Sequence, residues 1–321
     1  MSVGVLLVGL GQIGMGYDLD IDREAQVYTH ANAFSRHPQF NLMAAVDQEE
    51  QRRQIFVQTY QCPAYADIDA ALRNHQPDLV VIAVPTQLHN EILRRVLRKS
   101  SPKVVLCEKP LSYDMAEARD MVQTCAAKGV GLYVNYMRRS DPGSIEIKHR
   151  IDTGEIGAPL KGVVWYSKGF LHNGSHFFNL MEYWLGPMLT AEVLASGRLW
   201  DGVDPEPDVR VIFTKGTMVF LAAWEEAYSH YTVEMLASNG RLRYEQGGEI
   251  IHWQTAQPDQ NFADYTVLSA QPQNIASGMD RYQWHVAEQL AAALGGRNSH
   301  LCSGAQALAT LEAMQTIIGM R

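Results

Sequence analysis

The sequence predicts an α/β protein in two parts: a parallel sheet covered by helices, then an α+β domain with a large, open, mainly antiparallel sheet. Short apolar segments alternate with helical segments up to residue 136. From residue 159 onward, strand patterns rich in β-branched and aromatic residues follow one another, and Ser238–Arg241 is a hairpin turn signal. We therefore expect two domains, residues 1–136 and residues 137–321.

Composition excludes several classes of protein. The 321 residues carry a formal net charge of −8 and no concentrated basic stripe, which argues against nucleic acid or an anionic membrane as a partner. No segment approaches the ~18 uninterrupted apolar residues of a membrane span, and no basic region precedes the first apolar run. The four cysteines are scattered without metal-ligand spacing, which is typical of reduced thiols. We expect a cytoplasmic protein.

The first strand, Val3–Val8, runs into a glycine-rich turn of the pattern G-x-G-x-x-G. The turn consists of Gly9, Leu10, Gly11, Gln12, Ile13 and Gly14. In a dinucleotide-binding strand–turn–helix unit, the first glycine makes the turn, the second lets the pyrophosphate approach and the third lets helix pack on strand. The sequence therefore predicts a nucleotide cofactor at this turn.

A second strand, Phe40–Val46, ends at Asp47. An acid at this position can accept hydrogen bonds from the adenosine ribose, and its charge disfavours a 2′-phosphate. We therefore expect NAD, with NADP less favoured. The alternative is a purely structural glycine turn with Asp47 as a helix cap.

The spacing between the turn and this acid is unusually long. Gly14 and Asp47 are 33 positions apart, whereas about 20 is usual. The extra length indicates an insertion, Gly16–Arg23, before a helix capped near Thr29. We expect a solvated loop, with a lid over the cofactor as the alternative.

This insertion contains three alternating acids, Asp18, Asp20 and Asp22, as calcium-binding loops often do. An EF-hand loop starting at Asp18 requires glycine at its sixth and glutamate at its twelfth position. Those positions hold Arg23 and Thr29. We expect no metal.

Two further strands end in residues suited to a ligand site. Leu79–Val84 is followed by Pro85 and Thr86, where Thr86 could cap a helix that carries His89. His89 is either a packing or surface residue or a cofactor contact. Gly131–Asn135 is a later strand of the same series, whose alternation with helices implies a parallel sheet.

Between them lies the segment on which the functional prediction depends. Val104–Cys107 is a short apolar strand that ends in Glu108, Lys109 and Pro110. Ligands of open α/β sheets bind beyond the carboxyl ends of the strands. Lys109 is therefore placed to reach a ligand, unless it is an ordinary solvated lysine.

In the second half, a helix opening near Leu171 carries two histidines four residues apart, His172 and His176. A zinc pair lacks a third ligand at motif spacing. The histidines either belong to a structural helix start or act as proton donor and acceptor, since histidine titrates near neutral pH.

Together these motifs resemble the glucose–fructose oxidoreductase / inositol dehydrogenase / rhizopine-catabolism (Gfo/Idh/MocA) superfamily. The matching pieces are Gly9–Gly14, Val84–Thr86 with His89, Cys107–Pro110, Asn135–Tyr136 with Arg138–Arg139, Gly154–Gly157 and Gly174–His176. The resemblance implies a Rossmann domain, a C-terminal sheet used for oligomerisation, hydride transfer with NAD(P) and a Lys-Pro peptide that is often cis. It also implies Lys109 and His176 as catalytic residues, with Glu108 and Asn135 near the nicotinamide ribose.

Two positions depart from the pattern of this superfamily. Relatives often place an aspartate four residues before the site histidine and an acid three residues after it, where this chain has His172 and Asn179. A strict Lys-Asp-His relay is therefore not expected, and Lys109 is favoured as the residue that transfers the proton.

The leading hypothesis is the interconversion of a secondary alcohol and a ketone on a sugar, sugar derivative or polyol. His172, Asn173 and Arg138 would hold other hydroxyls or an acidic group of this small-molecule substrate. The alternatives are a non-catalytic NAD-sensing regulator and NAD-assisted glycoside cleavage. We expect a homodimer or homotetramer formed through the C-terminal sheet.

Overall fold

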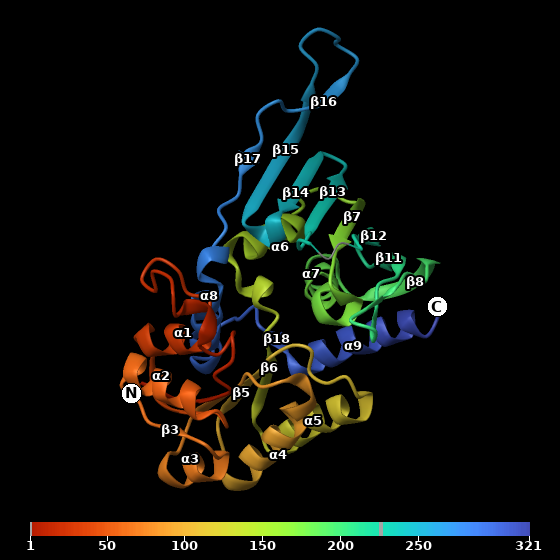
Figure 1. The fold of residues 1–321 in the computed structure, drawn as a ribbon. Coiled ribbons are helices and arrows are strands. Elements are labelled where there is room, and N and C mark those ends of the chain that lie inside the picture. The colour runs from red at the N-terminus through yellow and green to blue at the C-terminus, as the bar shows by residue number, and fades with distance from the viewer. Residues whose placement is uncertain (1, 225–226) are drawn as a thin grey trace. The chain divides into compact units, whose positions relative to one another are not determined.

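The computed structural model describes residues 2–224 and 227–321, drawn as a ribbon in Figure 1. The chain divides into two compact units. The first unit takes the chain up to Ser140 together with Asp280–Ala309, and the second takes Asp141–Met279 and Thr310–Arg321.

The first unit is built on a sheet in the strand order β18-β6-β5-β4-β1-β2-β3. All of its pairings are parallel except that of β18 with β6. The strands are β1 (Val3–Val8), β2 (Phe40–Val46), β3 (Ala64–Tyr65), β4 (Leu79–Ile82), β5 (Val104–Cys107), β6 (Gly131–Val134) and β18 (Cys302–Ser303). The helices are α1 (His30–Arg36), α2 (Glu50–Tyr60), α3 (Ile68–Asn74), α4 (His89–Lys99), α5 (Met115–Ala127) and α8 (Tyr282–Leu294).

The central strands of this sheet are apolar because helices bury both of their faces. Leu6 and Leu7 of β1 and Val80 and Val81 of β4 are fully buried. The parallel sheet predicted from the sequence is confirmed. One predicted helix start is confirmed as well, since the Thr29 side chain caps α1 by accepting a backbone N–H. The Asp114 side chain caps α5 in the same way.

The insertion after the glycine turn is less exposed to solvent than predicted. A solvated loop was expected at Gly16–Arg23, but Asp18 is fully buried. Its Oδ2 accepts hydrogen bonds from the N–H of Thr29 (2.8 Å), the Thr29 hydroxyl (2.7 Å) and the N–H of Tyr28 (3.1 Å). The prediction is therefore wrong at Asp18, because this carboxylate joins the insertion to the residues at the start of α1.

Despite the inserted residues, helix α1 still begins next to the glycine turn. The N–H of His30 donates to the Ile13 carbonyl (3.1 Å) and that of Ala31 to the Gly14 carbonyl (2.9 Å). Helix α1 therefore begins directly beside the glycines although about fifteen residues separate them in sequence. In the described part of the chain, no group of three or more His, Cys, Asp or Glu side chains is placed to hold a metal ion.

The predicted division at residues 136 and 137 differs from the structure in one respect. The chain first leaves the first unit after Ser140, and it later returns to supply α8 and β18. Val286 and Leu290 of α8 are buried in the same core as Leu7 and Phe34. A pattern of apolar residues shows which face a helix buries but not which sheet it covers, so the sequence assigned α8 to the wrong domain.

The second unit is built on a larger sheet in the order β16-β15-β14-β13-β7-β12-β11-β8, with β17 beside β15. The pairing of β7 with β12 is parallel and the other pairings are antiparallel, which confirms the predicted class of sheet. Its strands are β7 (Leu160–Tyr166), β8 (Met188–Ala195), β11 (Asp208–Phe213), β12 (Gly216–Ala222), β13 (Thr232–Ala237), β14 (Gly240–Glu245), β15 (Ile250–Pro258), β16 (Thr266–Leu268) and β17 (Gln273–Asn274). A small separate pair is formed by β9 (Leu199–Trp200) and β10 (Asp204–Pro205).

The helices that belong to this unit lie on one face of its sheet (Figure 1). They are α6 (Pro142–Thr153), α7 (Ser175–Leu185) and the part of α9 (Gly304–Ile318) from Thr310 onward. Along β13, Val233 and Met235 are buried while Glu234 and Leu236 are exposed, and this alternation leaves the opposite face open.

The aromatic residues predicted for this sheet divide between core and surface. Tyr166, Phe213 and Phe220 are buried, and Phe178 of α7 packs on the last two. Trp165 is 38% exposed. Core packing thus accounts for most of them. Among the described residues, no helix combines the length and the apolar character needed to cross a membrane.

Candidate active site

The glycine turn has the shape that a dinucleotide requires. A Cβ on Gly9 would lie 2.3 Å from the Ala83 carbonyl oxygen, and one on Gly14 would lie 2.2 Å from the Gly9 carbonyl oxygen. These two glycines let the backbone segments touch. A Cβ on Gly11 would meet no protein atom within 4 Å. The turn is therefore tight on its protein side and open at Gly11, as expected where backbone meets a pyrophosphate.

Asp47 is held against this turn. Its Oδ2 accepts the N–H of Leu10 at 2.8 Å, and its Oδ1 accepts the N–H of Glu49 at 2.9 Å. The side chain of Asp47 is 8% exposed, and the guanidinium of Arg52 lies 3.7 Å from Oδ2. Each carboxylate oxygen retains one acceptor position, so binding of ribose hydroxyls is compatible with these bonds.

A cluster of three polar side chains lies at the carboxyl end of β5. Oε1 of Glu108 is 2.7 Å from His30 Nε2 and accepts a second bond, also of 2.7 Å, from Asn135 Nδ2. His30 and Asn135 are buried, and buried polar groups in proteins nearly always have hydrogen-bond partners. Asn135 Oδ1 has no hydrogen-bond partner in the described part of the chain. This buried acceptor fits a ligand that brings its own donor.

The electrostatics of this cluster keep Glu108 ionised. Burial raises the pKa of its carboxyl, but the hydrogen bonds from His30 and Asn135 and the charges of His30 and Lys109 outweigh burial. The pKa of Glu108 is consequently below its usual value. A negative charge therefore persists beside Lys109 at neutral pH.

Lys109 is half-buried and follows Glu108 directly, and the peptide bond between Lys109 and Pro110 is cis, as the resemblance implied. Lys109 lies at the carboxyl end of β5, whose neighbours in the sheet are β4 and β6. The structure therefore has Lys109 at the carboxyl edge of the parallel sheet, where the sequence placed it.

His89 lies in the core. Its ring nitrogens are 3.0 Å from the Val84 carbonyl oxygen and 3.2 Å from that of Leu111, and its side chain is fully buried. Burial lowers the pKa of His89, although the two carbonyls oppose this effect. His89 thus joins the loop after β4 to the loop after Lys109, and a direct cofactor contact stays a prediction.

The predicted helix cap at Thr86 is wrong. Pro85 precedes a short 3-10 turn, Thr86–Leu88, in which no side-chain cap forms, and α4 begins only at His89. The carbonyl of Pro85 instead accepts the N–H of Leu88 at 2.9 Å. Both residues nevertheless lie in the loop after β4, next to the loop that carries Lys109 in the strand order.

The remaining predicted residues of the first unit lie just before its boundary. Arg138 is buried within the 3-10 turn Met137–Ser140, which follows β6 and Asn135. The first unit thus brings together the glycine turn with Asp47, and Glu108 with Asn135. Lys109 belongs to this unit and His176 to the other, and their cooperation stays a prediction.

In the second unit, the predicted helix start is a π-helical turn, Gly169–Gly174, followed by α7. His176 is 8% exposed. The ring of His172 stacks on Trp200, with centroids 5.0 Å apart, and Asn173 Nδ2 donates to the Tyr231 hydroxyl at 2.7 Å. Such π-helical turns are frequent at functional sites.

Two acids that the sequence did not single out hold this turn. Asp204 accepts the N–H of His172 (2.7 Å) and of Leu171 (3.0 Å), and Glu206 accepts that of Gly169 (3.0 Å). Burial raises the pKa of Asp204 despite these backbone bonds. Their position, about thirty residues after the histidines, gave no local signal.

Asn179, which stands where relatives often have an acid, is fully buried and donates to the Thr310 hydroxyl at 2.9 Å. Its amide is thus used to fix α9 on α7 within the second unit. A carboxylate partner for the histidines is therefore not provided at position 179.

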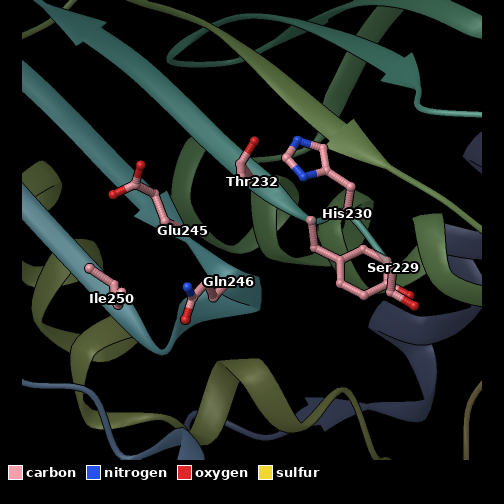
Figure 2. A pocket seen from close by; sticks show the side chains of 7 residues that line it. Ser229, His230, Thr232, Glu245, Gln246 and Ile250 are labelled. Carbon is pink, nitrogen blue, oxygen red and sulfur yellow. The ribbon is translucent and has the colours of Figure 1, made fainter. Parts of the chain in front are cut away.

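A hollow of about 550 Å³ lies at one end of the large sheet, beside the π-helical turn. Figure 2 shows its side chains on neighbouring strands, with Thr232 on β13 and Glu245 on β14. Its lining residues are Ser229, His230, Tyr231, Thr232, Glu245, Gln246 and Ile250. Tyr231 links this hollow to Asn173 through the bond described above.

Comparison with known proteins identifies the first unit. Residues 3–136 match the family described as "Oxidoreductase family, NAD-binding Rossmann fold" (GFO_IDH_MocA). Inositol 2-dehydrogenase of Mycolicibacterium smegmatis is 42% identical over 100 residues, which are 31% of this chain and 28% of that protein. The matched part of the chain spans between 28% and 58% of the first such relatives' own length.

Solved structures are similar over nearly the whole chain. Aldose-aldose oxidoreductase from Caulobacter crescentus, complexed with glycerol, has a TM-score of 0.76 at 17% identity, with 100% of this chain and 97% of that chain covered. An oxidoreductase from Agrobacterium radiobacter, in complex with NAD+, L-tartaric acid and magnesium, has a TM-score of 0.73 at 17% identity, with 98% and 95% covered. At such identities the similarity shows a shared two-domain fold.

The glycine turn, the ionised Glu108 at the end of β5 and the family match thus agree. Residues 3–136 match the Gfo/Idh/MocA oxidoreductase family, and the first unit has the NAD-binding Rossmann fold by which that family is described.

Proposed function

We propose that this chain is an NAD(P)-dependent dehydrogenase that interconverts a secondary alcohol and a ketone on a sugar, sugar derivative or polyol. The observation that supports it most is Lys109 at the carboxyl end of β5, beside an ionised Glu108 and in the same sheet as the glycine turn. Ligands of this class of fold bind along that edge.

The residues of the first unit fit a dinucleotide. The backbone around Gly11 would hold the pyrophosphate, Asp47 the adenosine ribose, and Glu108 with Asn135 the second ribose. When bound, the nicotinamide supplies the two-electron step by accepting the hydrogen and electron pair of the carbinol C–H.

The protein must then remove the hydroxyl proton. Lys109, in its neutral form, would accept that proton as the C=O bond forms, so that alcohol and NAD⁺ give ketone and NADH with one proton released. The same group would donate the proton in the reverse direction. His176 would be the second proton carrier, while His172, Asn173 and Arg138 would hold the other hydroxyls or an acidic group.

NAD is proposed over NADP because Asp47 faces the glycine turn and its charge opposes a 2′-phosphate. Arg52 weakens this argument, since its guanidinium lies 3.7 Å from the same carboxylate and could receive a phosphate. We therefore expect a preference for NAD rather than exclusion of NADP.

The substrate class is proposed from the relatives, several of which are named inositol 2-dehydrogenases. The open face of the large sheet, which exposes Trp165 and Leu236, would pair with a second copy to give a homodimer or homotetramer.

The test is NADH formation by the purified chain over a panel of inositols, sugars, sugar acids and nucleotide sugars, with NAD⁺ and NADP⁺ in parallel. We expect turnover with at least one polyol or sugar, and faster turnover with NAD⁺. Tight NAD binding without turnover on any of them would favour a regulatory protein. Release of a glycosidic leaving group without net NADH would favour glycoside cleavage.

A further inference from the structure

His30, which neither the motif pattern nor the proposed proton transfer uses, lies at the centre of the first unit's polar cluster. Its Nε2 is 2.7 Å from Glu108 Oε1, and the two residues are 78 positions apart. The His30 side chain is 1% exposed and that of Glu108 13% exposed. A short bond between a buried imidazole and a carboxylate is among the stronger hydrogen bonds of proteins.

The two bonds to Glu108 saturate one oxygen and leave the other available. Oε1 receives His30 and Asn135, which fill both of its acceptor positions. Within the described residues, Oε2 receives no hydrogen bond. The N–H of Glu108 is fixed to the Ile82 carbonyl at 2.9 Å, so backbone and carboxylate are both held. The carboxylate therefore presents Oε2 in one fixed direction.

His30 also connects this carboxylate to the glycine turn. It is the first residue of α1, and its N–H donates to the Ile13 carbonyl. Its Nδ1 is buried and has no partner in the described part of the chain. Burying a polar atom without a partner is destabilising, and an apolar residue at this position would avoid that cost. Stability alone therefore does not explain a histidine here.

We infer that His30 is a positioning residue of the cofactor site: together with Asn135 it fixes Oε1 of Glu108, so that Oε2 is preset to accept a ribose hydroxyl of the dinucleotide. The inference rests on the proposed function in taking a dinucleotide as the ligand. His30 itself touches neither the cofactor nor the substrate in this account.

The ionisation of Glu108 gives a pH-dependent signature. The other titratable groups whose charges couple to it are Lys109, His89, Cys107 and Tyr282. Without the His30 donor, the pKa of Glu108 rises, because burial is then opposed by fewer favourable contacts. Loss of cofactor affinity on acidification should therefore begin at a higher pH in a variant that lacks this donor.

The test compares NADH dissociation constants from pH 5 to pH 9, roughly the range in which binding assays are practical, for the whole chain and three variants. His30→Phe keeps an aromatic ring against Phe34 but has no N–H, and His30→Gln restores an N–H near the position of Nε2. His37→Phe is the control, because His37 caps the end of the same helix, is also buried and packs on aromatic rings, and forms no hydrogen bond with Glu108 among the described residues. Melting temperatures of all three are measured alongside.

We expect His30→Phe to weaken NADH binding about tenfold at pH 7, as for a lost hydrogen bond to a charged group, and to move the acidic limb to higher pH. His30→Gln should recover most of the affinity, and His37→Phe should bind as the parent does. Parent-like binding by His30→Phe, or equal losses in the glutamine variant, would overturn the inference. The readout is binding, so a chain that binds NADH but oxidises no sugar would count against the proposed reaction alone.

Discussion

A side chain at Gly11 would meet no protein atom, whereas one at Gly9 or Gly14 would overlap backbone oxygen atoms. The three glycines of the turn are thus needed for different reasons. Gly9 and Gly14 are required by the fold, because Gly9 lies against the backbone of Ala83 and Gly14 against that of Gly9. Gly11 is required only if something else occupies the space above the turn.

Gly11→Ala separates these two roles. We expect the variant to fold with an unchanged melting temperature, because its Cβ meets nothing within 4 Å, and to bind NADH at least about tenfold more weakly, because the methyl group enters the space of the pyrophosphate. Thermal melting and NADH titration measure the two effects. A variant that melts like the parent and also binds NADH like the parent would show that no dinucleotide lies at this turn.

Single residues were predictable from sequence where a motif fixes them locally. The glycines, Asp47 and Lys109 each lie at the end of a strand that the apolar pattern marks, so their placement followed from strand order. His30 was not predictable in this way, because its partner is 78 positions distant. Asp204 and Glu206 were not predicted for the same reason. Their carboxylates accept hydrogen bonds from backbone N–H groups of a distant segment, those of Gly169 and His172.

At the scale of elements, the insertion after the turn shows how a local pattern can mislead. Asp18, Asp20 and Asp22 look alike in sequence, and solvation was predicted for all three. In the structure Asp18 is fully buried, whereas Asp20 is exposed. What distinguishes them is the return of the chain at Tyr28 and Thr29, which carries the N–H groups that Asp18 accepts.

Asp18→Ala should therefore destabilise the first unit by about 3 kcal/mol or more, because the buried N–H groups of Tyr28 and Thr29 and the Thr29 hydroxyl lose their acceptor. Urea unfolding followed by a probe in this unit measures the loss. The matched control is Asp20→Ala, for which we expect a change within about 0.5 kcal/mol. Equal stability of the two variants would mean that Asp18 does not hold the insertion closed.

The π-helical turn before α7 is a second element that the sequence located only approximately. The helix was expected to open near Leu171, and the regular α-helix begins at Ser175. The intervening turn, Gly169–Gly174, depends on acceptors supplied by Asp204 and Glu206. Helical periodicity does not reveal a turn whose hydrogen bonds are provided from elsewhere in the chain.

At the scale of the whole molecule, the fold class was predictable and the division of the chain was not. Alternating strands and helices indicated the parallel sheet, and tight turns indicated the antiparallel one. The return of α8 and β18 to the first unit is determined by tertiary contacts. Helix α8 packs in the same core as Phe34, and Cys302 of β18 pairs with Val134 of β6. No spacing within residues 280–309 carries that information.

The division also separates the two residues that we propose as catalytic. Lys109 belongs to the unit that would bind the dinucleotide, and His176 to the unit that carries the hollow beside Tyr231. Loss of Lys109 should therefore impair chemistry while it leaves the glycine turn, and thus cofactor binding, intact.

The most direct test of the central claim is the turnover number and the NADH affinity of Lys109→Ala, with Lys103→Ala as control. Lys103 is on the same segment but is 68% exposed and paired with Asp78. We predict that Lys109→Ala binds NADH within about threefold of the parent and loses turnover by about 10²-fold or more, and that Lys103→Ala keeps both. Parent-like turnover in Lys109→Ala would contradict the account.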